Sequence, residues 1–148
     1  MISENNISRA PKIDGKYLNI GIDCEDIERW RNMLPKLEAG YQRKLFTEDE
    51  HRYCCSFKDP APHYAARWCA KEALLKALSP FYKLDLREIE IANDVEGRPF
   101  FILNCPEMVG LNLTIRLSMT HSRVTAMAAV IVIRLEGGTE KNNKGCTS

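Results

Sequence analysis

Several acidic, basic and imidazole side chains in this sequence have the types that phosphoryl transfer requires. Asp23 closes an apolar segment, and Glu25 follows shortly after it. Glu72 and Lys76 lie one turn apart in a predicted helix, and His121 lies between two apolar segments. Carboxylates suit Mg²⁺, while lysine and protonated histidine supply positive charge to phosphate oxygens. These residues therefore form a candidate site for metal-assisted phosphoryl transfer.

Each of these residues also has a purely structural explanation. Asp23 could cap the helix that follows it, and Glu25 could favour the dipole of that helix. Glu72 and Lys76 could form a helical ion pair worth about 0.2–0.5 kcal/mol. His121 could be an ordinary turn residue. Zinc is less suited than magnesium, because no histidines and cysteines have the spacing of a zinc site.

The composition of the whole chain narrows the class of protein. Its 148 residues, 45% hydrophobic and 28% charged, indicate one globular domain with a genuine core. A formal net charge of +1 gives no argument for nucleic acid or a membrane surface as partner, and no segment is long enough to span a bilayer. The six cysteines form no C-x-x-C pair, and the N-terminus lacks a secretion signal. We expect reduced thiols and a cytoplasmic location.

The first part of the chain predicts the elements that position Asp23, Glu72 and Lys76. Residues 1–16 and 136–148 are expected to be disordered tails around a single domain, residues 17–135. Alternating apolar residues predict a strand that starts near Leu18 and ends on Asp23. Three helices should follow. The first covers residues 27–34, and the second, a short helix, runs from the capping box 47–50 into the 53–57 region. The third is a long helix that starts just after 59–62 and ends near Ser79-Pro80.

The second part of the chain has the pattern of β structure. Four strands are predicted, near residues 89–91, 99–103, 111–118 and 126–133, with turn residues at 93–97. The last apolar run suits a central strand buried on both faces. Short connections favour antiparallel pairing, so the fold class is α+β in the order β-α-α-α-β-β-β-β. An antiparallel sheet packed against one long helix leaves a sheet face that would need a partner.

Several motifs occur in a fixed order between about Leu18 and Ile133. They are Gly21-Ile22-Asp23 with Ile27-Glu28-Arg29, Arg67-Trp68-Cys69-Ala70-Lys71-Glu72-Ala73 with Lys76-Ala77, Asn93-Asp94, Gly97-Arg98-Pro99, and Leu117-Ser118-Met119-Thr120-His121. Together they resemble the motifs of the holo-acyl-carrier-protein synthases, the small type of 4′-phosphopantetheinyl transferase. The resemblance implies the 4′-phosphopantetheinyl transferase-like fold. It also implies magnesium-dependent transfer of the phosphopantetheine arm of coenzyme A to a serine of an apo-acyl carrier protein, releasing adenosine 3′,5′-bisphosphate.

The resemblance also implies roles for individual residues. Asp23 and Glu72 would bind the metal, and Lys76 would bind the diphosphate. Glu72 or a metal-bound water would take the proton from the attacking serine. The residues lining the coenzyme A site would be Arg67, Lys71, Lys76 and His121, with His121 near a phosphate.

The remaining implied roles concern partners. Arg29 would contact an acidic residue of the carrier protein. Asp23-Cys24-Glu25 is also similar to the D-x-E motif of the larger, two-lobed transferases, which makes Glu25 a possible third metal ligand. The family builds its sites between subunits of a homotrimer, so Asp23 and Glu72 would come from one subunit and His121 from its neighbour.

Ser79-Pro80-Phe81-Tyr82 replaces the Gly-rich turn that the family usually has after the long helix. Two other functions are compatible with parts of the pattern. One is a non-catalytic module that binds coenzyme A or a carrier protein. The other is a magnesium-dependent nucleotide hydrolase on another fold, which would attack its diphosphate with water.

Overall fold

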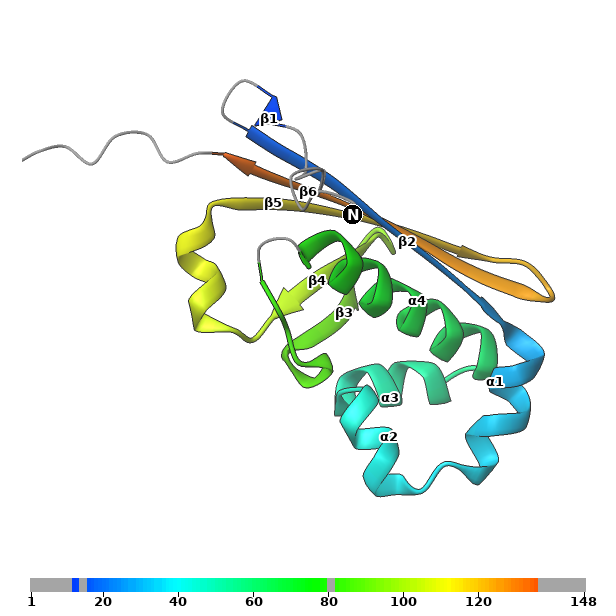
Figure 1. Cartoon of the computed structure of the whole chain (residues 1–148). Helices are drawn as coiled ribbons and strands as arrows, with labels where there is room; N and C mark the ends of the chain where they lie inside the picture. Colours follow the sequence, from blue (N-terminus) through cyan, green and yellow to red (C-terminus); the bar gives the residue numbers. More distant parts are fainter. Residues whose placement is uncertain (1–11, 14–15, 80–81, 136–148) are drawn as a thin grey trace, which may run out of the picture.

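A long helix, α4, lies along one face of an antiparallel sheet, and the smaller helices gather at one end of it (Figure 1). The computed structural model describes residues 12–13, 16–79 and 82–135. The strands and helices are β1 (Lys12–Ile13), β2 (Lys16–Asp26), α1 (Ile27–Met33), α2 (Ala39–Leu45), α3 (Glu48–Cys55), α4 (Ala61–Leu78), β3 (Ile89–Asn93), β4 (Pro99–Leu103), β5 (Leu113–His121) and β6 (Thr125–Leu135). Short 3-10 helices occupy Leu34–Lys36, Leu86–Glu88 and Pro106–Leu111.

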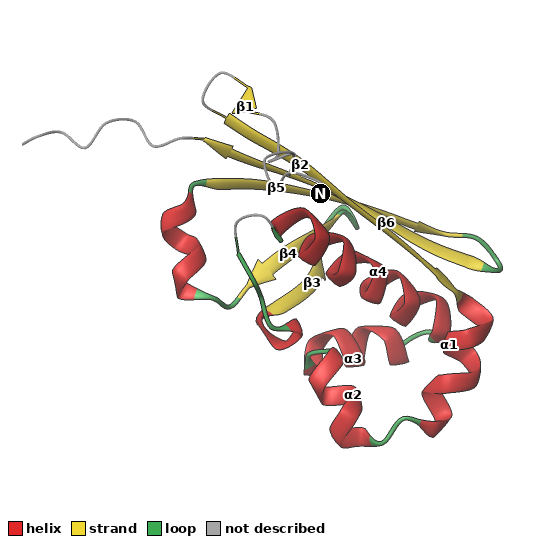
Figure 2. Cartoon of the chain, in the orientation of Figure 1, coloured by secondary structure: helices red, strands yellow, loops and turns green. Residues whose placement is uncertain are grey.

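The strands form two antiparallel sheets (Figure 2). The larger sheet has the strand order β1-β2-β6-β5, so β6 lies between β2 and β5. In its register Asp23 is opposite Ala128, and His121 is opposite Ala126. The smaller sheet is the hairpin β3-β4. The α+β class and the antiparallel pairing predicted from the sequence are confirmed, but the four later strands divide between the two sheets and do not form one meander.

Small residues bring α4 unusually close to β2. Gly21 on β2 is buried, and a Cβ atom at this position would lie 1.8 Å from the carbonyl oxygen of Ala73. Ala70, Ala73 and Ala77 are fully buried on the same helix. The side chain of Asn19 closes the contact by donating a 2.7 Å hydrogen bond to the Ala77 carbonyl. This close packing fixes the positions of Glu72 and Lys76 on α4 relative to β2.

The predicted capping box at the start of α3 is confirmed. The Thr47 hydroxyl accepts from the Glu50 amide at 3.3 Å, and the Glu50 carboxylate accepts from the Thr47 amide at 2.9 Å. The residue that caps α1 is Asp26, and not Asp23 as the structural explanation of Asp23 would require. Asp26 accepts the Arg29 amide at 3.0 Å and caps the helix. Strand β2 therefore continues past Asp23, and Asp23 has no capping role.

Other boundaries also differ from the sequence-based prediction. Helix α2 was not predicted, because it has no apolar stripe. Leu45 is the only one of its residues that is buried. Lys12–Ile13, inside the predicted N-terminal tail, is a strand paired with β2. Most of that tail, the whole C-terminal tail, and Pro80 and Phe81 lie outside the described residues.

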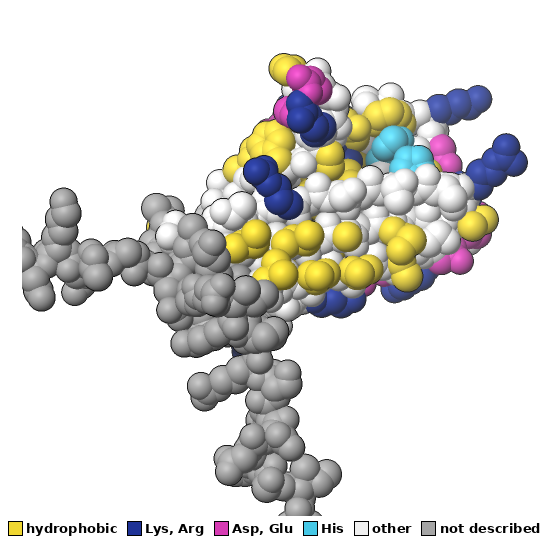
Figure 3. Space-filling view, turned by 90° about the horizontal axis from the view of Figure 1, so that it is seen from above, with side chains coloured by type: hydrophobic (Ala, Val, Ile, Leu, Met, Phe, Trp, Pro, Cys, Tyr) yellow, Lys and Arg dark blue, Asp and Glu magenta, His cyan; other side chains and the backbone are white. Residues whose placement is uncertain are grey.

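The outer face of the larger sheet carries exposed apolar side chains. Strand β6 is central, but it is buried on one face only, since Met127 and Ile131 remain 44% and 40% exposed. The expectation of burial on both faces is therefore wrong for the single chain. Hydrophobic side chains run along this face in Figure 3, and the large exposed ones on β2 are Leu18, Ile20 and Ile22.

Candidate functional site

Asp23 and Lys76 meet where β2 crosses α4. The ammonium of Lys76 donates to Asp23 Oδ1 at 2.8 Å and to the Ile22 carbonyl at 3.0 Å. The Asp23 side chain is only 15% exposed, whereas that of Lys76 is 52% exposed. The second carboxylate oxygen, Asp23 Oδ2, is buried and has no hydrogen-bond partner. Because a buried carboxylate oxygen without a partner is costly, this atom points to a missing cation or donor.

Glu72 lies one turn before Lys76 on α4 and is partly buried. Burial raises the pKa of its carboxyl group, and the negative charge of Asp23 raises it further. Among the described residues, Glu72 makes no hydrogen bond or ion pair, and Lys76 pairs with Asp23 instead. The ion pair between Glu72 and Lys76 that helical spacing allows is therefore not the arrangement found.

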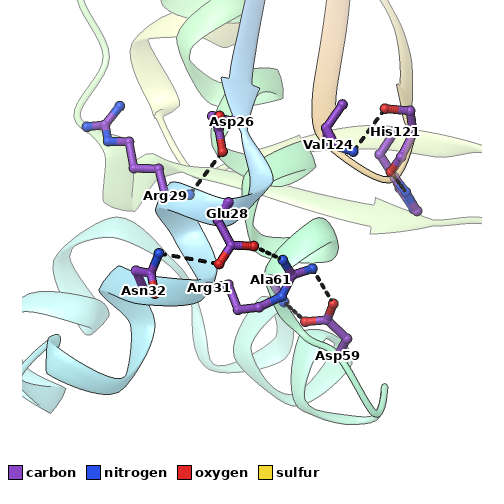
Figure 4. Close-up of polar contacts among 10 residues, drawn as sticks. Asp26, Glu28, Arg29, Arg31, Asn32, Asp59, Ala61, His121 and Val124 are labelled. Atoms are coloured by element: carbon purple, nitrogen blue, oxygen red, sulfur yellow. Dashed lines mark hydrogen bonds and ion pairs between the residues drawn. The ribbon is translucent and has the colours of Figure 1, made fainter.

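Glu25 extends this acidic region along β2 and is also tied to α1. Its Oε2 accepts from Arg29 Nη1 at 3.1 Å and from the indole nitrogen of Trp30 at 3.3 Å. The side chain of Glu25 is 13% exposed, and that of Arg29 is 68% exposed. Figure 4 shows the Arg29 side chain directed away from the contacts that Arg31 makes with Glu28 and Asp59. Arg29 thus presents its guanidinium to solvent.

Two residues expected to contact coenzyme A are instead inside the protein. Lys71 is fully buried, its ammonium pairs with Glu50 at 2.8 Å, and it donates to the Leu45 carbonyl at 2.8 Å. Arg67 is 1% exposed and donates to the Asn93 side chain at 3.1 Å. Both cations are buried in the single chain, and contacts of Lys71 and Arg67 with coenzyme A stay a prediction. Both residues tie α4 to neighbouring elements.

His121 ends β5 and is exposed. Strand β6 lies between β5 and β2, at about 5 Å from each. Within the described residues, His121 makes no contact with Asp23, Glu72 or Lys76. The structure thus brings together Asp23, Lys76, Glu72 and Glu25, and places His121 apart from them.

Two surface grooves lie near these residues. A groove of about 680 Å³ between α1 and α2 is lined by Arg29 and by residues that the sequence did not single out, which include Met33, Lys36, Leu37 and Tyr41. The signal available was the spacing of Arg29 and Lys36, two helical turns apart. A second groove, of about 590 Å³, lies between β4 and β5, and its lining includes Arg98, Arg116 and Ser118. Asp94, which pairs with Arg98 at 3.4 Å, also lines this groove, so its charge is mixed.

The carboxylates around Asp23 suit magnesium, which needs few protein ligands. They do not form a site in which the protein supplies every ligand. No group of three or more histidine, cysteine or acidic side chains within the described part of the chain is arranged to hold a metal. Magnesium commonly takes only one or two carboxylates and completes its shell with water and phosphate oxygens. The unpartnered Asp23 oxygen and the adjacent Glu72 carboxylate meet that requirement.

In the same described residues, no helix is both long and apolar enough to cross a bilayer.

Comparisons with known proteins identify the family of the chain. A model of the 4′-phosphopantetheinyl transferase superfamily matches residues 19–126. The holo-[acyl-carrier-protein] synthase of Syntrophus aciditrophicus is 39% identical over 119 residues, which cover 76% of this chain and 92% of that protein. That of Thermodesulfovibrio yellowstonii is 34% identical over 113 residues, covering 76% and 96%.

A solved structure shows the same fold. The holo-(acyl-carrier-protein) synthase of Bacillus anthracis, in complex with CoA (3′,5′-ADP), has 28% sequence identity and a TM-score of 0.64. The match covers 79% of this chain and 96% of that chain. The chain therefore belongs to the 4′-phosphopantetheinyl transferase superfamily and, within it, to the holo-acyl-carrier-protein synthases.

Proposed function

We propose that this protein transfers the 4′-phosphopantetheine arm of coenzyme A to a serine of an apo-acyl carrier protein, with Mg²⁺, and releases adenosine 3′,5′-bisphosphate. The observation that carries the proposal is the buried, unpartnered oxygen of Asp23 beside Glu72 and Lys76. A module that only binds coenzyme A has no need of these two neighbouring carboxylates. The coenzyme A complexes of the related synthases support coenzyme A as the donor.

Asp23 and Glu72 are the residues that would hold the magnesium ion. When bound, the metal would neutralise charge on the diphosphate of coenzyme A. Glu25 could supply a third carboxylate, although its Oε2 is already shared by Arg29 and Trp30. The raised pKa of Glu72 fits this role, because a nearby cation offsets the cost of holding its charge in a partly buried site.

Lys76 and Glu72 are the residues proposed to act on the reacting groups. The exposed ammonium of Lys76 can donate to a diphosphate oxygen while it stays close to Asp23. It would stabilise the negative charge that develops on the leaving phosphate. The Glu72 carboxylate, whose pKa burial raises, is suited to accept the proton of the attacking serine hydroxyl.

His121 would complete the site from a neighbouring subunit. It is separated from Asp23 in its own chain by a whole strand, yet its exposed imidazole could contact a phosphate of coenzyme A bound to another chain. The apolar outer face of β2 and β6 offers a surface for assembly, since a contiguous exposed apolar patch commonly marks an interface. We propose a cyclic homotrimer in which each site is shared by two subunits.

The groove between α1 and α2 is the proposed contact for the carrier protein. Arg29 and Lys36 give it positive charge beside one acidic residue, Glu38. Met33, Leu37 and Tyr41 give it apolar surface. An acidic helix of a carrier protein would match both features, and the attraction would weaken as salt screens the charges. Arg29 lines the groove and contacts Glu25, so a bound carrier would lie beside the acidic side chains of β2.

Mass spectrometry of the carrier protein tests the reaction directly. The chain is incubated with coenzyme A, an apo-acyl carrier protein and either Mg²⁺ or a chelator. We expect the carrier to gain the mass of one phosphopantetheine group only when Mg²⁺ is present. Asp23→Ala and Glu72→Ala should each lower the rate by about a hundredfold to a thousandfold. Glu48→Gln, at an exposed carboxylate paired with Arg43, is the matched control and should keep the full rate.

The same experiment separates the other functions. A binding module would retain coenzyme A but leave the carrier mass unchanged. A nucleotide hydrolase would consume coenzyme A without modifying the carrier. Transfer at the normal rate by Asp23→Ala or Glu72→Ala at saturating Mg²⁺ would refute the assignment of the metal-binding residues.

A further inference from the structure

An aromatic and imidazole cluster adjoins His121 at the start of α4. The ring of His63 lies 5.5 Å from that of His121 in an edge-to-face arrangement. On its other side His63 stacks on Phe57, with the ring centroids 3.6 Å apart and an angle of 20° between the planes. Tyr53 approaches both Phe57 and His63, at 5.1 and 6.0 Å. Histidine side chains are visible beside hydrophobic ones on the face shown in Figure 3.

The base of this cluster is a buried cation. The guanidinium carbon of Arg67 lies 3.8 Å from the centre of the Tyr53 ring, an arrangement that favours attraction between the two groups. Arg67 is also anchored to Asn93 on β3. The cluster therefore rests on α3, α4 and β3, which are parts of the folded core. His121, by contrast, projects from the end of a strand.

The charge of His63 follows from its neighbours. Burial lowers the pKa of His63, the positive charges of His121 and Arg67 lower it further, and Asp59 opposes them. The facing groups come from β5, from α4 itself and from the loop before α4, while Tyr53 and Phe57 contribute neutral rings. The lowered pKa favours the uncharged form of His63, which meets His121 as an aromatic ring.

The orientation of His121 has little other support. Its polar contact within the described residues is a long one, 3.4 Å from Nδ1 to the carbonyl of the next residue, Ser122. The edge-to-face contact with His63 joins the His121 ring to the folded core. Such aromatic pairs have a preferred geometry and add to the stability of that geometry.

We propose that His63 is a positioning residue for His121, and that the His63 ring, stacked on Phe57, holds the His121 imidazole in the orientation in which it meets coenzyme A. This inference rests on the proposed function, in which His121 contacts a phosphate. Each chain would then give its neighbour's site more than His121 of the β5–β6 hairpin. Residues at the start of α4 and the end of α3 would support that histidine.

Kinetics of His63 variants test the proposal. His63→Ala removes the ring, and we expect the KM for coenzyme A to rise about two- to tenfold, the range given by an aromatic pair. The kcat should not change, since His63 lies at the start of α4 and Lys76 near its end. His63→Phe keeps the edge-to-face contact and should restore the wild-type KM. Thermal unfolding of both variants identifies any general loss of stability.

A double-mutant cycle sharpens the test. If His63 acts through His121, His63→Ala should raise the KM no further when His121 is already alanine. Additive effects of the two substitutions would overturn the proposal, as would a wild-type KM in His63→Ala.

An NMR measurement separates this proposal from the proposed function. The His121 ring protons should shift in His63→Ala, because the neighbouring ring is lost, and shift less in His63→Phe. Unchanged His121 resonances in His63→Ala would refute the positioning contact, whatever the activity. Shifted resonances in a protein that never modifies a carrier would instead confirm the contact and refute the proposed function.

Discussion

Gly21→Ala should disturb the site more than any other single methyl group added to β2. The new Cβ would lie 1.8 Å from the Ala73 carbonyl oxygen, 2.8 Å from its carbon and 3.0 Å from the Ala77 amide nitrogen. All three are backbone atoms of α4, so no side chain can turn away to make room. Since carbon atoms pack best at about 3.5–4.0 Å, the helix or the strand must shift by about 1 Å or more.

The expected cost combines two opposing effects. Overpacking of this kind destabilises by about 1–3 kcal/mol, whereas replacing a strand glycine with alanine recovers about 0.5–1 kcal/mol of conformational entropy. The overpacking is larger, so the variant should fold but with a lower free energy of unfolding. The effect on transfer should be greater, because Ala73 is next to Glu72 and a 1 Å displacement of a catalytic group can cost about a hundredfold in rate.

Gly40→Ala is the matched control. Gly40 lies in α2, and no atom lies within 4 Å of the position where its Cβ would be. Alanine there should stabilise the helix by about 0.5–1 kcal/mol without changing the rate. Urea denaturation gives the free energy of unfolding, and carrier mass spectrometry gives the rate. A Gly21→Ala variant as stable and as active as the wild type would refute the close approach of β2 and α4.

Three further predictions concern charged and titrating groups. Lys71→Met leaves Glu50 buried without its cation and should lower the free energy of unfolding by about 3–5 kcal/mol in urea, whereas Lys71→Met with Glu50→Gln should recover part of it. The raised pKa of Glu72 means that its charge opposes folding at neutral pH. Without magnesium, Glu72→Gln should therefore have a higher Tm than the wild type at pH 8, by a margin that shrinks as the pH falls through the raised pKa. The pKa of His63 is lowered, so its contribution to stability is complete above about pH 6.5 and is lost as the pH falls through the lowered pKa; His63→Phe should remove this loss in unfolding midpoints measured from pH 8 to pH 5. An equal pH dependence in wild type and variant would contradict the last two predictions.

Local sequence signals predicted the elements well where one chemical pattern decides the structure. The Thr47–Glu50 capping box and the long apolar helix α4 are found as expected, because both depend on residues close together in the chain. Helix α2 escaped prediction because it has no apolar stripe, and Leu45 is its single buried residue. The end of β2 was placed too early, since Asp23 and Asp26 are equally good caps in sequence.

The site was predicted in part, for a reason that α4 makes clear. This helix packs between the sheet and the smaller helices, so it is apolar on most sides and its sequence does not show which charged residues face inward. Lys71 and Glu72 are adjacent, yet Lys71 is fully buried while Glu72 is partly exposed beside Asp23. The partner that keeps Lys71 inside is Glu50, on a different helix. Only the tertiary structure brings the two together.

Mixed trimers test the central claim, that each transferase site joins Asp23, Glu72 and Lys76 of one chain to His121 of the next. Glu72→Ala and His121→Ala chains are co-expressed with different affinity tags, and trimers that carry both tags are purified. In every mixed ring of three, one interface joins an intact Glu72 to an intact His121. Carrier mass spectrometry should show transfer restored to about a third of the wild-type sites. Mixed trimers with only the residual activity of the two variants would contradict the shared site.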